Sequence, residues 1–130
     1  MCFYRISKHK RSDTPITVYK VMRKISSGCI NSIYYSALTP YLVGQKIVAA
    51  HSADTELMDM AFALDREIVH AYHTLNRARL QIKPICIFSD TLYPDMLAIV
   101  ECEIPPGVEY WLGYNGEIGA REMKIVSINN

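Results

Sequence analysis

Hydrophobic and polar positions alternate most regularly in the last third of the chain. Within Leu97–Ile104 every second residue, beginning at Ala98, is apolar, and Glu101 and Glu103 lie between these positions. A period of two predicts a β-strand with one buried face. The other two residues on the glutamate face are also apolar, so we expect the solvent face of this strand to be only partly polar.

Turn-forming residues bound the strands that follow. Pro105-Pro106-Gly107 removes hydrogen-bond donors from the ladder and turns the chain. Asn115-Gly116 is the dipeptide that a two-residue type I′ hairpin prefers, because both turn positions need positive φ. The pattern therefore predicts an aromatic strand over Tyr110–Tyr114, a tight turn, and a last strand over Met123–Ile128.

The first half of the chain predicts shorter extended segments. Ile16–Ile25 is rich in β-branched residues and alternates, which indicates a first strand. Ser26-Ser27-Gly28 is a turn that ends it. Ile33–Leu38 is a tyrosine-rich extended or irregular segment, and Tyr41–Ala50 is expected to be a loop that leads into a short strand.

The middle of the chain has the period of an amphipathic helix. Apolar residues recur at spacings of three and four over Asp54–Gln81, which predicts one continuous helix. The alternative is a break at Glu67–Tyr72, where β-branched and aromatic residues weaken the helical pattern. Lys83-Pro84 is expected to end the helix. Pro84–Phe88 then predicts a short buried strand.

Length and composition place these elements in one domain. The chain has 130 residues, half of them hydrophobic, which is enough for one packed core. We expect a single α+β domain over residues 16–130, with a mostly antiparallel sheet of about five strands and one or two helices on one face. Residues 1–15 are basic, and we expect a solvated, partly mobile terminus.

Charge and cysteine usage argue against several functional classes. The 14 Lys and Arg residues balance 13 Asp and Glu, so the net charge of +1 does not favour nucleic acid or an anionic membrane. The four cysteines are far apart and form no Cys-x-x-Cys pair, which is typical of a reducing compartment. No apolar run reaches the roughly 18 residues of a membrane span, and the N-terminus does not have the pattern of a signal peptide. We expect a cytoplasmic protein without membrane contact.

No motif in the chain specifies a metal, a cofactor or a catalytic nucleophile. Glu67-x-x-His70 and His73 have the one-turn spacing of helix-borne ligands, but a dinuclear site would need a second such motif. Glycine-rich phosphate loops and the Gly-x-Ser-x-Gly elbow are missing. We assign no metal site and no cofactor.

Aromatic residues are the candidates for binding. Tyr and Trp bury a large area and dominate binding hot spots. With a net charge near zero, they favour a non-enzymatic module that binds a protein partner or a second copy of itself. The candidate contact residues are Tyr34, Tyr35, Tyr41, Tyr110, Trp111 and Tyr114.

Five segments follow one another in a recognisable order: Tyr19-Lys20-Val21, Ile68–Tyr72, an acidic strand ending in Pro105-Pro106-Gly107, Tyr110–Gly113 and Ala120–Val126. In this order they resemble a group of small bacterial and phage-borne proteins that share a domain of unknown function. The resemblance implies an extended segment at Ile68–Tyr72 and a split helix, with one part near Asp54–Asp65 and a second near Thr74–Gln81. It implies no activity.

A second resemblance rests on Tyr19-Lys20, His70 and a late glutamate, either Glu117 or Glu122. Their order is similar to that of small ADP-ribosyltransferase-type domains, although the Arg, Ser-Thr-Ser and Glu-x-Glu signatures of those enzymes are not present. The resemblance implies that His70 holds a nicotinamide nucleotide while the glutamate orients the attacking group. A divergent nucleotide-handling enzyme is therefore the alternative to the binding module.

Overall fold

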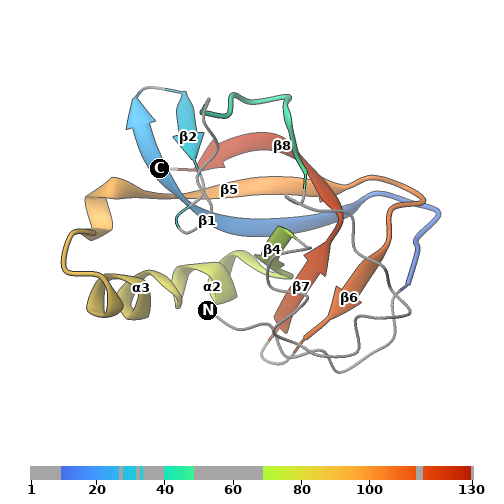
Figure 1. Ribbon diagram of the computed structural model, residues 1–130. Coiled ribbons are helices and arrows are strands. Elements are labelled where there is room, and N and C mark those ends of the chain that lie inside the picture. The colour runs from blue at the N-terminus through green and yellow to red at the C-terminus, as the bar shows by residue number, and fades with distance from the viewer. Residues whose placement is uncertain are drawn as a thin grey trace.

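The computed structural model of the chain describes residues 10–26, 28–31, 33, 40–48, 69–113 and 116–129. These residues form a mostly antiparallel open sheet with a helical segment packed on one of its faces (Figure 1). The single-domain α+β architecture with a mostly antiparallel sheet is confirmed, but the described sheet has eight strands where about five were expected.

All the described strand pairs are antiparallel. The strands are β1 (Ile16–Ser26), β2 (Cys29–Asn31), β3 (Lys46–Val48), β4 (Val69–Tyr72), β5 (Leu97–Ile104), β6 (Tyr110–Leu112), β7 (Glu117–Ala120) and β8 (Glu122–Asn129). They pair in the order β3-β8-β5-β1-β4-β7-β6, and β2 pairs with β1. The predicted first strand, the alternating strand and the last strand are confirmed as β1, β5 and β8. The short strand expected after Tyr41 is confirmed as β3.

A bend at Arg121 curves the sheet. Arg121 alone separates β7 from β8, yet β7 pairs with β4 and β6 while β8 pairs with β5 and β3. The two consecutive strands therefore belong to different parts of the sheet, which bends around an inner core (Figure 1). Buried residues of this inner core include Val18, Met22, Val100, Cys102, Ile118, Met123 and Ile125.

Two short helices cover the outer face of β1 and β5 (Figure 1). They are α2 (Leu75–Arg79) and α3 (Ile82–Phe88), and a 3-10 turn, η1 (Pro94–Met96), leads from α3 into β5. The helices contribute Ala78 and Ile85 to a second core cluster, which includes Leu97 and Ile99 of β5. This second cluster explains why the glutamate face of β5 is only partly polar in sequence.

The prediction of one continuous helix over Asp54–Gln81 is wrong. Val69–Tyr72 is the strand β4, which pairs with β7 along its whole length, and the helix begins again at Leu75. Thr74 caps α2, because its hydroxyl oxygen accepts a hydrogen bond of 3.1 Å from the backbone N–H of Arg77. The split version is confirmed at β4 and α2, and the helix expected near Asp54–Asp65 lies outside the described residues.

The expected end of the helix at Lys83-Pro84 and the strand expected at Pro84–Phe88 are also wrong, because these residues belong to α3. Pro84 is the third residue of α3, where the missing N–H removes no helical hydrogen bond. Its ring would clash with the carbonyl of Leu80, four residues earlier, in an unbroken helix. The helical segment is therefore interrupted at Leu80–Gln81 and resumes, instead of ending.

The predicted two-residue hairpin turn is replaced by a longer loop. The backbone N–H of Gly113 donates a hydrogen bond of 2.9 Å to the carbonyl of Glu117, which leaves three residues between the closing pair. Gly116 has φ of +75°, in the left-handed region that favours glycine. A type I′ turn would leave only two residues between the closing pair, and Asn115 of the predicted dipeptide lies outside the described residues.

Candidate functional site

Three of the six aromatic binding candidates lie in the described part of the chain. Trp111 of β6 is 1% exposed, so its ring is not available at the surface. Tyr41 and Tyr110 are half-buried and pack against the inner core. Tyr34, Tyr35 and Tyr114 lie outside the described residues. The aromatic strand therefore supplies packing at Trp111 where the sequence predicted a contact surface.

Charged residues near Trp111 connect the segments that meet at the bend of the sheet. The guanidinium carbon of Arg121 lies 5.6 Å from the centre of the Trp111 ring, within the range of a cation–π contact. The Oε1 atom of Glu109 lies 3.5 Å from Nε of Arg121 and 3.1 Å from Nη2 of Arg11. Arg11 also donates a hydrogen bond of 2.6 Å to the carbonyl of Gly107. These contacts join the bend at Arg121 to the Pro-Pro-Gly turn and to the segment before β1.

The structure brings two of the three catalytic candidates onto one face. In the β4–β7 ladder His70 is opposite Gly119, and Glu117 is opposite Tyr72. His70 and Glu117 are therefore diagonal neighbours on the same face, about 7–8 Å apart at their Cα atoms. A histidine and a glutamate at this separation can both contact one bound substrate.

Glu122 does not belong to this pair. It lies in β8, beyond the bend, where its register partner is Val48 of β3. Its Oε2 atom is 3.5 Å from Nζ of Lys46, whose side chain is largely exposed. Glu122 is thus one half of a surface ion pair, separate from the β4–β7 ladder.

Lys20 is a residue whose setting the sequence reasoning missed. It lies on the inner face of β1 between Val18 and Met22, and its Nζ donates a hydrogen bond of 2.9 Å to the carbonyl of His70. Burial lowers the pKa of Lys20 from its usual 10.5 to about 8. The signal in the sequence was a lysine on the apolar side of an alternating strand, which is a rare position for a charge.

Cys102 lies on the same inner face and is fully buried. Burial raises the pKa of its thiol from 9.0 to about 12, an effect that outweighs the opposing influence of Lys20. Both groups therefore favour their neutral forms compared with the same groups in water. The thiol of Cys102 is held inside the core, away from solvent-borne substrates, whereas Lys20 as a whole residue is half-buried.

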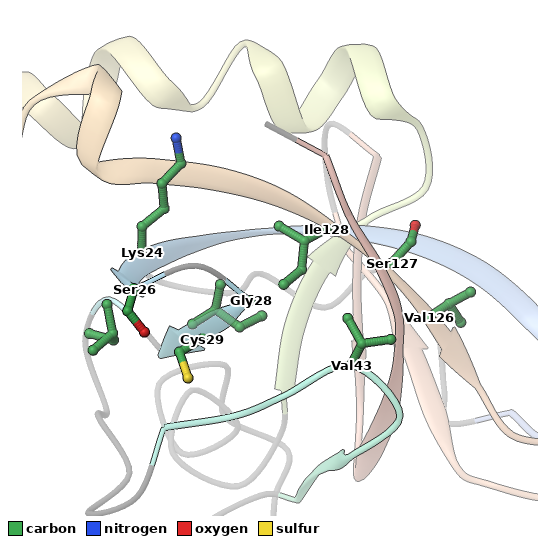
Figure 2. A pocket seen from close by; sticks show the side chains of 10 residues that line it. Lys24, Ser26, Gly28, Cys29, Val43, Val126, Ser127 and Ile128 are labelled. Carbon is green, nitrogen blue, oxygen red and sulfur yellow. The ribbon is translucent and has the colours of Figure 1, made fainter.

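A pocket of about 720 Å³ opens beside the β1–β2 hairpin and the end of β8 (Figure 2). Its walls are mainly apolar and include Ile30, Val43 and Ile128, with the thiol of Cys29 among them. Lys24 also belongs to the lining, but its side chain points away from the other labelled groups (Figure 2). Among the residues that line the pocket, none presents a charge into it.

The most exposed large apolar side chains of the described residues lie on α3. Phe88 is 89% exposed and Ile87 is 69% exposed. We call the following set the α3 patch: Leu80, Pro84, Ile87, Phe88, Tyr93 and Met96, all exposed. The opposite side of the helical segment packs on the sheet through Ala78 and Ile85. The helical segment is therefore apolar on two faces, of which only one is covered. The apolar run Pro84–Phe88 was the signal for this surface.

Comparisons with protein-family models, curated proteins and solved structures found no match to this chain. Both resemblances drawn from the sequence therefore remain predictions. In the part of the chain that the structure describes, no helix is long and apolar enough to cross a membrane. Within the same ranges, no three His, Cys, Asp or Glu side chains are grouped as a metal site requires.

Proposed function

We propose that the chain is a non-enzymatic binding module that contacts a protein partner through the α3 patch. The observation that carries the proposal is the exposure of Phe88 and Ile87 on a helix whose other face already packs on the sheet. A helix that is apolar on all sides is normally buried. Covering each of these side chains contributes about 1.5–3 kcal/mol.

The proposed contact surface is the α3 patch, whereas the sequence predicted contact residues on β6. Trp111 is buried against Arg121, whereas Tyr93 of the α3 patch is 58% exposed. Groups of exposed large apolar residues commonly mark protein–protein interaction sites. The aromatic and aliphatic side chains of the α3 patch supply the anchors that hot spots require.

We further propose that the module works in the cytoplasm. Cys29, Cys86 and Cys102 are free thiols, which supports a reducing compartment.

The size of the native complex tests the proposed function. We expect the wild-type chain in a gentle lysate of its source cells to elute well above its 14.8 kDa monomer mass. Phe88→Asp should elute as the monomer, because a charge in the α3 patch opposes burial. Val43→Asp is the matched control, since Val43 is 52% exposed and lies outside the α3 patch. Identical elution of wild type and Phe88→Asp would overturn the proposal.

A divergent nucleotide-handling enzyme is the second candidate. It is supported by one observation, the placement of His70 and Glu117 on the same face of the β4–β7 ladder. In this candidate His70 binds the nicotinamide nucleotide and Glu117 orients the attacking group.

A further inference from the structure

The charges that flank the α3 patch are ordered along the helix. Arg79 and Lys83 are exposed on its N-terminal side, and Asp90 and Asp95 are exposed beyond its C-terminal end. The two most exposed apolar residues lie between these groups. Along the chain, the exposed residues therefore change from positive, through apolar, to negative, and α2 and α3 run in one direction before the chain turns (Figure 1).

We propose that the partner at the α3 patch is a second copy of this chain, paired antiparallel about a two-fold axis beside Ile87. The proposal rests on the proposed binding function and names its partner. A two-fold interface requires a surface that is complementary to itself when its direction is reversed. The order of charges meets this requirement, because reversal places the basic end of one copy beside the acidic end of the other.

The positions of individual residues agree with one axis. Lys83 lies four residues before Ile87 in α3, and Asp90 lies just beyond the end of the helix, so an axis beside Ile87 would bring Lys83 of each copy near Asp90 of the other. Ile87 and Phe88 of both copies then pack at the centre, where side chains are most fully desolvated.

The alternative arrangements are less favourable. A parallel pair would place Lys83 beside Lys83 and Asp90 beside Asp90, and like charges that face each other disfavour a complex. The net charge of +1 produces little long-range repulsion between two copies. A partner of another sequence would need a charge order opposite to that of the α3 patch, which a second copy supplies by symmetry.

Sedimentation velocity on the purified full chain, from about 1 to about 500 µM, tests the proposal. We expect a monomer–dimer equilibrium for wild type and for Val43→Asp, and a monomer throughout for Phe88→Asp. Lys83→Glu and Asp90→Lys should each weaken the dimer about tenfold, because each places like charges together. The double variant Lys83→Glu/Asp90→Lys restores both opposite-charge contacts and should dimerise within about threefold of wild type. All these side chains are exposed, and circular dichroism checks that each variant folds.

Three results would overturn the second copy as partner: a wild type that stays monomeric, a dimer that Phe88→Asp leaves intact, or a double variant no better than the single ones. The native complex in lysate distinguishes this failure from that of the proposed function. If the purified chain is monomeric while Phe88→Asp still shrinks the native complex, the binding surface stands and its partner is another protein. If neither measurement responds to Phe88→Asp, the binding function fails as well.

Discussion

Lys20 and His70 are joined by a hydrogen bond of 2.9 Å from the lysine ammonium to the histidine backbone carbonyl. The contact links β1 to β4, whose backbone register consists of the single pair Tyr19–Tyr72. A charged side chain thus supplements the ladder where two strands diverge. Burying the Lys20 ammonium costs free energy, and this desolvation lowers its pKa to about 8.

The buried ammonium predicts a pH-dependent stability. The pKa of Lys20 is about 8 in the folded chain and 10.5 in the unfolded chain, so the unfolded chain holds more protons between these values. The free energy of unfolding therefore rises with pH across this window. Relative to Lys20→Met, the wild type should gain about 1 kcal/mol between pH 8 and pH 9, measured by urea unfolding.

Above pH 9 the thiol of Cys102 acts in the opposite direction. Its folded-state pKa of about 12 exceeds the unfolded value of 9.0, so the unfolded chain loses its proton first and stability falls. The gain from Lys20 is therefore clearest between pH 8 and pH 9. Parallel stability profiles for wild type and Lys20→Met in that window would contradict a buried ammonium at this position.

The rate of thiol labelling should differ among the described cysteines according to how deeply each is buried. Cys102 is fully buried with a raised pKa, whereas Cys29 and Cys86 are half-buried. Because the thiolate is the reactive form, maleimide should modify Cys29 and Cys86 of the native chain long before Cys102. Peptide mass spectrometry over time gives the three rates, and urea should bring the rate at Cys102 up to the others. Equal rates without urea would show that the inner core is open.

The two ion pairs at the start of β8 should differ in strength. Glu109 and Arg121 have side chains that are 13% and 22% exposed, so a double-mutant cycle with Glu109→Gln and Arg121→Gln should give a coupling of about 1–2 kcal/mol. Lys46 and Glu122 are the control, with a more exposed pair at a similar distance. Their cycle should give about 0.5 kcal/mol or less. Equal couplings in urea unfolding would mean that the bend at Arg121 does not depend on Glu109.

Thermal melts with NAD test the enzymatic alternative. A ligand that binds the folded chain at about one hundred times its dissociation constant adds about 2.7 kcal/mol of stability. The binding-module proposal predicts no shift with NAD for wild type or for His70→Ala. A reproducible shift that His70→Ala and Glu117→Gln abolish, but Glu122→Gln retains, would favour the enzyme.

Strand patterns in this chain were informative wherever one face of a strand is buried. The strands β1 and β5 follow their alternation, and their ends coincide with turn residues such as Gly107. Helical periodicity failed at Val69–Tyr72, because a strand with residues packed on both faces can carry the same apolar spacings. There the tertiary pairing with β7 decided the structure.

The candidate site was harder to predict, for physical reasons. The five apolar residues Pro84–Phe88 have no period of their own, so sequence alone could not tell a buried strand from a helix with two apolar faces. Trp111 was expected at the surface from its residue type, but in the folded chain it is buried beside Arg121, a contact that no local motif marks. Lys20 shows the same dependence, since only the folded chain brings it to the His70 carbonyl.

A photo-crosslink at position 88 is the most direct test of the α3 patch as a binding surface. Benzoylphenylalanine replaces Phe88, whose side chain is 89% exposed. The same substitution at Leu42, whose side chain is 47% exposed, is the control. On irradiation in the source cells, we predict a discrete adduct at position 88 and none at position 42, and an adduct of twice the monomer mass identifies the partner as a second copy. The same yield of adduct at both positions, or no adduct at position 88, would contradict the account.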